Sequence, residues 1–347
     1  MKTGFRLLVW GVCAVGWVCG LASGQPPARE LERFESTQTQ MGVPFKIILY
    51  APDEATAKGA FTAAFSRVSE LNRILSDYDP ESELSHLSQS APSKQPIRLS
   101  DPLWLVLERS QQVAEQSDGA FDVTVGPYVR LWRRARREKQ MPSAERLAEA
   151  RAAVGYQYVR LDPAQHTARL LRANMRLDLG GIAMGYAVDE TLKLLKARGI
   201  RSALVDASGD IAVGDPPPGK PGWKIGIAPL SAEGTPARFV SLANAAVTTA
   251  GDAFQHVAID GKRYSHIVDP RTGLGMTDRC GVAVIARDCI TADSLDTAIS
   301  VMGPAEGLKL IERTPGTAAF IVCPSDAGTI IHQSPNFESY VVPPAGD

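Results

Sequence analysis

The chain has 347 residues, with 37 Lys and Arg against 38 Asp and Glu, and therefore a formal net charge of −1 at pH 7. This balance argues against a general nucleic-acid-binding protein, which carries an excess of basic charge. The hydrophobic fraction of 44% and the charged fraction of 22% are typical of a globular protein and exclude a disordered chain. The length allows one large core or two modest ones.

The first 24 residues have the layout of a cleaved secretory signal. Lys2 and Arg6 precede an apolar run, and Ala22, Ser23 and Gly24 supply the small residues of a cleavage site. The apolar run is short for a helix that spans a bilayer. We therefore expect export to the periplasm and cleavage after Gly24.

The mature chain is then expected to open with a polar lead-in over residues 25–40, and the folded domain to cover 41–343. A lipid anchor on Cys19 is not expected, because bulky Trp17 and Val18 precede it where small residues are required.

Three cysteines remain after the signal, namely Cys280, Cys289 and Cys323. An odd number does not make a disulfide framework. One bridge and three buried thiols are both compatible with the sequence, and the spacing matches no zinc site.

The N-terminal half alternates helices and loops. Residues 41–51 predict a strand, and 54–75 a helix, since apolar residues recur there at helical spacing. A loop with a short helix follows over 76–96. Ser100 is an N-cap candidate for a helix that runs to about Gln116.

A basic run over residues 130–139 is interpreted as a solvated helix face rather than a polyanion site. Glu138 and an acidic helix expected over 145–154 dilute its charge. Residues 156–181 then predict three short strands with turns at Asp162-Pro163 and near Ala173.

The C-terminal half is rich in predicted strands. A helix from about Ile182 to Arg198 precedes it and is closed by Gly199. The following strands are interrupted by one helix over 291–302. Strands with interspersed helices predict an α+β fold, a single large mixed domain with antiparallel-rich sheets and flanking helices.

The helix "TADSLDTAISVMG" carries two distinct faces. Its apolar stripe consists of Leu295, Ala298, Ile299 and Met302. A second face holds Asp293, Asp296 and Thr297 at i, i+3 and i+4. These hard oxygen donors are the ligands that Mg²⁺ or Ca²⁺ prefers, whereas acids near a helix start are also favoured by the helix dipole alone.

Two further segments have patterns compatible with a site. In "RLDLGGIAMGYAVDE" a strand ends at Leu179, and the glycines before the next helix either expose N–H groups to a phosphate or simply form a turn. In "KRYSHIVDPRTG" a strand runs into a turn, with Tyr264, His266 and Val268 on one face and Ile267 on the other. Local pattern alone does not decide whether His266 is structural or chemical.

Taken together and in order, the motifs closely resemble those of the FAD:protein FMN transferases, the ApbE-type flavin transferases. The matching segments span residues 41–303 and are "MGVPFKI", "SDYDPESELSHL", "GAFDVTVGP", "LDLGGIAMGYAVD", "SGDI", "WKIGI", "TTAGD", "RYSHIVDPRTG" and "TADSLDTAISVMG". The last two are the most specific, and the strand segments are generic.

This resemblance implies an ApbE-like T-fold and an exported, Mg²⁺-dependent enzyme. Such an enzyme cleaves FAD, its substrate, attaches FMN to a Thr hydroxyl of an exported acceptor flavoprotein and releases AMP. The acceptor is expected to be of the electron-transport subunit type, with membrane-surface association through it and no nucleic-acid partner.

The resemblance also implies roles for individual residues. His266 is the general base. The metal ligands are Gly181 through its carbonyl, Asp293, Asp296 and Thr297. The flavin nucleotide is expected to contact Met41, Tyr78, Ala120, Phe121, Asp122, Asp178, Met184 and Ile267.

The chain departs from the family pattern at three positions. Met184 stands where Lys or an acid is usual, Ala250 where Ser is common, and Ser88 where Asn is usual. Two alternatives to transfer stay open on the sequence: an FAD pyrophosphatase that releases FMN and AMP, and a periplasmic FAD-binding protein without turnover.

Overall fold

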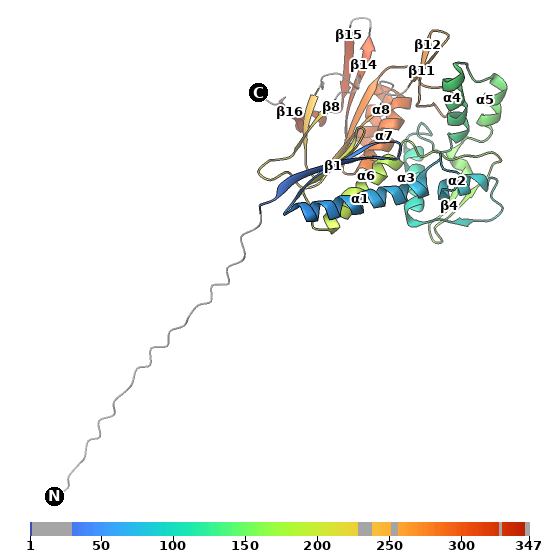
Figure 1. Ribbon diagram of the computed structural model, residues 1–347. Helices are drawn as coiled ribbons and strands as arrows, with labels where there is room; N and C mark the ends of the chain where they lie inside the picture. Colours follow the sequence, from blue (N-terminus) through green and yellow to red (C-terminus); the bar gives the residue numbers. More distant parts are fainter. Residues whose placement is uncertain (2–29, 228–237, 251–255, 326–327, 344–347) are drawn as a thin grey trace. The chain divides into compact units, whose positions relative to one another are not determined.

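The computed structural model describes Met1 and residues 30–227, 238–250, 256–325 and 328–343, and one compact unit comprises Leu31–Asp347 (Figure 1). The signal expected over residues 1–24 lies outside the described residues, Met1 apart. Within the described ranges, the helices are all too short or too polar to cross a bilayer.

An eight-stranded sheet forms the centre of this unit, and every neighbouring pair of its strands is antiparallel. This confirms the expected antiparallel-rich α+β architecture. In spatial order the strands are β1 (Glu32–Gln40), β2 (Val43–Ala51), β6 (Ala203–Ala207), β7 (Asp210–Val213), β10 (Ala245–Ala250), β13 (Gly281–Ala286), β14 (Ala318–Ser325) and β15 (Gly328–Gln333).

Strand β1 corrects the expected polar lead-in over residues 25–40. Glu32 to Gln40 pair in register with Ala51 to Val43, so the folded unit begins about ten residues before Met41. Most of these side chains are exposed and only Phe34 packs on the core. A polar strand at a sheet edge lacks the apolar alternation by which strands are recognised, because one or both of its faces meet water.

The two faces of the central sheet are covered differently. Val282 and Val284 of β13 point to the helices, whereas Ala283 and Ile285 point to a second sheet, because side chains alternate along a strand. β13 is therefore buried along its whole length. The second sheet consists of β16 (Val341–Val342), β9 (Arg238–Leu242) and β8 (Trp223–Ile227).

Several helices begin at residues whose side chains cap them. Asp53 accepts a hydrogen bond from Thr56 N at 2.8 Å where α1 begins, and Ser100 caps α3 as predicted. Gly199 has φ +84° and closes α6. The helices are α1 (Glu54–Leu75), α2 (Glu83–Gln89), α3 (Asp101–Gln116), α4 (Gly126–Glu138), α5 (Ala144–Arg151), α6 (Ala183–Ala197), α7 (Cys289–Met302) and α8 (Pro304–Arg313).

Helix α8 was not expected, since only one helix was predicted in the strand-rich C-terminal half. Gly303, with φ +81°, ends α7 and is at once the N-cap of α8, whose first residue is Pro304. Proline is favoured at the first position of a helix, so the Gly-Pro pair restarts a helix here.

Two expected strands also differ from prediction. Of the three short strands over 156–181, only β4 (Val159–Asp162) and β5 (Thr167–Leu170) form, with β3 (Ile97–Arg98) beside β5. The third is replaced by an isolated bridge between Val125 and Arg176. In the hairpin of β11 (His256–Ile259) and β12 (Lys262–Ser265), the ladder stops one residue before His266.

Candidate active site

A cleft of about 330 Å³ gathers residues from motifs that are far apart in the sequence. His266, Gly181 and Thr297 line it together with all eight residues predicted to contact the nucleotide. These eight are Met41, Tyr78, Ala120, Phe121, Asp122, Asp178, Met184 and Ile267. Asp293 and Asp296 do not line the cleft, because they lie deeper, with exposed fractions of 5% and 2%.

The turn at Gly180 and Gly181, just before α6, brings α6 against α7. A Cβ at position 181 would lie 2.6 Å from the Thr297 hydroxyl oxygen, and a Cβ at position 185 would lie 2.4 Å from the carbonyl oxygen of Cys289. Both approaches are too close for any side chain larger than hydrogen. The glycines therefore allow the contact between the two helices on which the site is built.

Two carboxylates on α7 are held by direct hydrogen bonds. Asp293 accepts from the backbone N–H of Gly185 at 2.9 Å. Asp296 accepts from the Thr248 hydroxyl at 2.6 Å, and from the hydroxyl of Thr297 at 3.4 Å. The predicted Asp/Thr face of this helix is thus fixed by partners on α6 and β10.

Buried carboxyl groups gather at this point without a basic partner among the described residues. Burial raises the pKa of Asp293 to about 7. Burial and then the neighbouring Asp293 raise the pKa of Asp296, and burial followed by Asp293 and Asp296 does the same for Asp210. Within the described part of the chain, no basic side chain forms an ion pair with any of the three.

These carboxylates fit a divalent cation only in combination with other oxygen donors. Among the described residues, no three His, Cys, Asp or Glu side chains are grouped closely enough to hold a metal by themselves. The Thr297 hydroxyl and the Gly181 carbonyl complete an all-oxygen donor set of the kind Mg²⁺ takes. Three buried carboxyl groups without a basic partner are the observation that a cation would satisfy, because a cation favours their charged form.

Arg133 is a cleft residue that was not predicted, since the basic run 130–139 was interpreted as a solvated face. Its guanidinium donates to Asp77 at 2.5 Å and to Asp178 at 3.2 Å, and lies 3.9 Å from the centre of the Tyr78 ring. Burial, followed by the charge of Asp77, raises the pKa of Asp178 to about 6, and Arg133 opposes this. The guanidinium thus fixes three residues at the rim of the cleft.

Asp122 lines the cleft, but its carboxylate accepts hydrogen bonds from neighbouring protein groups. It accepts from the N–H and the hydroxyl of Thr124 at 2.7 and 2.6 Å, and from Tyr156 N at 2.8 Å. Burial raises its pKa in spite of these bonds. The geometry therefore gives Asp122 a role in shaping the 119–125 turn.

His266 is exposed, in a bend rather than on a strand. The predicted common face with Tyr264 and Val268 is not formed, since both of those side chains are buried. Residues 265–273 are here called the His loop. Trp132 of α4 holds the end of this loop, because its Nε1 donates a hydrogen bond to the Gly273 carbonyl at 2.8 Å. Asp269 accepts from Arg271 N and Nε, each at 2.9 Å, which fixes the turn that follows.

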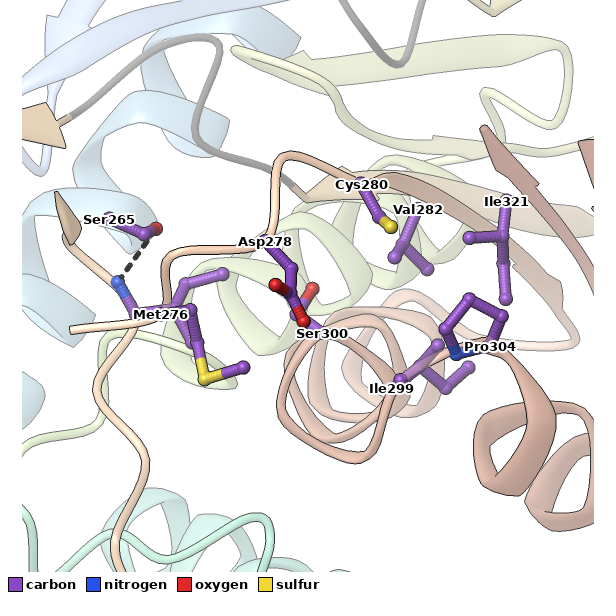
Figure 2. A pocket seen from close by; sticks show the side chains of 11 residues that line it. Ser265, Met276, Asp278, Cys280, Val282, Ile299, Ser300, Pro304 and Ile321 are labelled. Carbon is purple, nitrogen blue, oxygen red and sulfur yellow. Dashed lines mark hydrogen bonds between the residues drawn. The ribbon is translucent and has the colours of Figure 1, made fainter. Parts of the chain in front are cut away.

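A segment over residues 274–280, here called the strap, holds the other side of the His loop. Ser265 N donates to the Met276 carbonyl at 2.7 Å, and Met276 N donates to the Ile267 carbonyl at 2.9 Å. Figure 2 shows a small cavity between Ser265, the strap and the α7–α8 junction, and Asp278, Ser300 and Pro304 are among the residues that line it.

The strap ends at Cys280, which forms a disulfide with Cys323 of β14, with Cα atoms 4.2 Å apart. Cys289 is a buried free thiol. Of the two alternatives that the sequence left open, the structure has the single bridge. The side chain of Cys280 is seen at the rim of the same cavity (Figure 2).

Sequence reasoning missed several residues that support the site. Asp77 and Arg133 lie in the cleft wall, and Thr248 and Asp210 lie against the carboxylates of α7. Thr248 and Asp210 stand in the quoted motifs "TTAGD" and "SGDI", so their position was a usable signal. The sequence around Arg133 carried no such signal, because its partners Asp178 and Asp77 are 45 and 56 residues away.

Comparisons with known proteins agree with this geometry. The FAD:protein FMN transferase of Haemophilus influenzae is 30% identical, over 96% of this chain and 98% of its own length. That of Treponema pallidum is 32% identical, over 92% and 90%. The structure of the flavin transferase ApbE from Vibrio cholerae is similar with a TM-score of 0.81 at 29% identity, covering 89% of this chain and 99% of that one.

The structure of the ApbE protein from Thermotoga maritima is also similar, with a TM-score of 0.80 at 27% identity. The match covers 90% of this chain and 100% of that one. The model of the ApbE family matches residues 41–321, a range that includes every residue lining the cleft. By sequence, by fold and by the arrangement of this cleft, the chain belongs to the ApbE family.

Proposed function

We propose that this protein is a Mg²⁺-dependent FAD:protein FMN transferase, an enzyme that moves FMN from FAD to a Thr of an acceptor protein and releases AMP. The observation that carries the proposal is the single cleft in which His266, Thr297, Gly181 and the predicted nucleotide contacts meet. The relatives from Haemophilus influenzae and Treponema pallidum are FAD:protein FMN transferases, which supports the proposal.

The cleft supplies the features that a flavin nucleotide requires. Its volume of about 330 Å³ lies in the range of small-molecule sites. Met41, Phe121 and Ile267 offer apolar contact for an aromatic ring system. Tyr78, with 76% of its surface exposed, stands at the mouth with Arg133 over its ring, and the pair can stack on a ring of the substrate.

The residues that would hold the metal are Asp293, Asp296, Thr297 and Gly181. A bound Mg²⁺ would supply charge neutralisation on the oxygens of the pyrophosphate. The protein's own contribution is to fix these donors. The hydrogen bonds from Gly185 to Asp293 and from Thr248 to Asp296 orient the carboxylates before any ligand arrives.

His266 is the residue best placed to act on the acceptor. A Thr hydroxyl is a weak nucleophile until a base removes its proton, and an imidazole is suited to this near neutral pH. In the proposed reaction His266 takes the hydroxyl proton while the Thr oxygen bonds to the FMN phosphorus. The bond from that phosphorus to the bridging oxygen breaks, and AMP leaves with the oxygen.

The exposure of His266 also favours a second candidate, FAD pyrophosphatase activity. An exposed imidazole at the edge of the cleft is open to water as well as to a protein hydroxyl. Water in place of Thr would release free FMN and AMP.

One experiment separates transfer, hydrolysis and simple binding. The purified protein is incubated with FAD, Mg²⁺ and a Thr-bearing acceptor domain, and covalent flavin is detected by in-gel fluorescence. A fluorescent acceptor band supports transfer. Free FMN without a band supports the pyrophosphatase, and bound FAD that stays intact would mean a flavin-binding protein without turnover.

We infer that the protein acts after export to the periplasm, on an exported acceptor of the electron-transport subunit type. Two observations support this: the signal-like segment over residues 1–24 and the Cys280–Cys323 disulfide. Disulfides persist in oxidising compartments and are rare in the cytosol. Chain-length analysis of the secreted protein, with the N-terminus determined by mass spectrometry, tests the cleavage after Gly24.

A further inference from the structure

A second concave site lies between α4 and α5, on a different face of α4 from the cleft. Its volume is about 490 Å³, and five arginines surround it. Arg130, Arg134 and Arg137 recur along α4 at i, i+4 and i+7, Arg146 comes from α5, and Arg176 precedes the turn at Asp178. We call this site the arginine groove.

The charge of the arginine groove is largely uncompensated. Arg134 is paired with Glu138 at 2.7 Å. The other four arginines form no ion pair with any described residue, and the one acid in the lining is Glu149. Glu138, which was expected to dilute the charge of the basic run, pairs on this face with Arg134, and Glu149 of the following helix lines the groove.

Arg176 is the most constrained member of the groove. Its side chain is half-buried, and its backbone pairs with Val125 at the start of α4. Burial, and after it the charge of Arg130, lowers the pKa of the guanidinium, while the charges of Asp77 and Asp178 act in the opposite direction. An anion bound in the groove would offset the repulsion between Arg130 and Arg176.

We propose that the arginine groove docks an acidic segment of the acceptor protein. This rests on the proposed transferase function, since it assigns the surface that recognises the second substrate. Arginine guanidiniums bind carboxylates in a bidentate manner, and a row of them along one helix face fits an extended chain with several Asp or Glu residues.

The shape of the groove favours a polypeptide over a membrane surface. Its floor is apolar and recessed between two helices, where Ala150 and Ala153 are buried and Leu131 is half-buried. A protein segment can enter such a recess, whereas a bilayer surface is flat on this scale. α4 also lines the cleft through Arg133 and Arg136, so a partner in the groove lies on the helix that borders the reacting centre.

The test uses fluorescence anisotropy with a labelled ten-residue peptide rich in Glu and Asp and containing one Thr. The groove variant is R130E/R137E. The matched control is K196E/R198E, which changes the net charge equally at exposed residues of α6 and its C-cap. The milder R130Q/R137Q variant removes the charge without reversing it, and thermal unfolding verifies that each variant is folded.

We expect the groove variant to bind the peptide at least about tenfold more weakly than wild type, with the neutral variant intermediate and the control unchanged. Equal affinity in all variants, or equal loss in groove and control variants, overturns the proposal. Vesicles of phosphatidylglycerol and phosphatidylcholine are tested in parallel by sedimentation. Groove-dependent binding of vesicles with no groove-dependent binding of peptide would assign the site to lipid and also overturn it.

Release of AMP from FAD is measured on the same variants with Mg²⁺ and the Thr-bearing acceptor domain, which keeps this inference separate from the proposed function. Absence of AMP release by the wild-type protein under these conditions would contradict the transferase assignment, whatever the result of the peptide measurement. Normal FAD turnover with groove-independent peptide binding would contradict the docking site alone.

Discussion

The hydroxyl oxygen of Thr297 lies 2.6 Å from where a Cβ on residue 181 would stand, so a hydrogen atom is all that position 181 can carry toward α7. The turn at Gly180 and Gly181 and the helix with the proposed metal ligands are therefore in contact where both line the cleft. Both contacting residues belong to the proposed donor set, and this contact defines the first prediction.

Gly181→Ala is expected to displace Thr297 and to reduce Mg²⁺-dependent FAD turnover by at least about tenfold, because misplacement on the scale of an ångström has such effects. A Mg²⁺ titration of AMP release measures it. Gly59→Ala in α1 is the control, since a Cβ there meets nothing within 4 Å. It should leave turnover unchanged and stabilise the helix by up to about 1 kcal/mol. Equal effects of the two changes would contradict the steric argument.

Thr297→Val keeps the shape of the side chain and removes its hydroxyl. We expect it to abolish Mg²⁺-dependent turnover while Thr297→Ser retains a large part, because the oxygen is the proposed ligand. Asp293→Ala should be inactive for the same reason. Full activity in Thr297→Val would remove this residue from the donor set.

His266→Ala is expected to slow FMN transfer by about 10²- to 10⁴-fold, the usual contribution of a general base. FAD affinity, measured by flavin fluorescence, should stay within about twofold, since the imidazole is exposed at the edge of the cleft. The exposed His86 of α2 gives the control variant, His86→Ala. Loss of FAD binding in His266→Ala would instead indicate a structural role.

Arg133→Gln removes the cation between Asp77 and Asp178 and should produce a pH-dependent loss of stability. The pKa of Asp178 is raised to about 6, so the stability that this carboxyl contributes is present below its unfolded pKa and is lost as pH rises through about 6. Without Arg133 its pKa rises further. Urea unfolding should show a loss of about 2 kcal/mol at pH 8 and a smaller loss at pH 5, where Asp178 is mostly protonated.

Arg134→Gln is the matched control for this measurement. Arg134 neighbours Arg133 on α4, but its pair with Glu138 is exposed, with side-chain exposures of 46% and 45%. Exposed pairs contribute at most about 1 kcal/mol, so we expect a small loss with little dependence on pH. A pH-independent loss in Arg133→Gln would mean that packing rather than charge is responsible.

The double variant C280S/C323S tests whether the disulfide keeps the strap against the His loop. Unfolding free energy should fall by about 3 kcal/mol, as for other bridges that close long loops. We also expect kcat for transfer to fall several-fold while KM for FAD stays near its wild-type value, because the strap contacts the His loop on the side of Ser265 and Ile267. Unchanged kcat would limit the bridge to a role in stability.

The sequence predicts those parts of the structure that depend on local rules. Helices α1 and α3 follow from periodicity and from the caps Asp53 and Ser100. β1 could not be predicted in the same way, because an edge strand needs no apolar face. The disulfide partner was undetermined among three cysteines, since pairing depends on which strands are neighbours.

In the candidate active site, too, some features could be predicted from the sequence and others depend on the tertiary structure. The predicted residues that line the cleft were implied by the resemblance to the ApbE-type flavin transferases, through the motifs that carry it. The contacts that hold those residues in place run between distant segments, such as Arg133 to Asp77 and Thr248 to Asp296. Side-chain partners of this kind become visible only when the sheet order is known.

The two faces of α4 have a consequence for how this family could diversify. Arg133 and Arg136 line the cleft, while Arg130, Arg134 and Arg137 surround the groove. Substitutions on the outer face leave the inner positions of the same helix untouched. On the proposed docking role, partner choice can change independently of chemistry, and substitution of the outer face of α4 offers a route to enzymes that label a chosen protein with flavin.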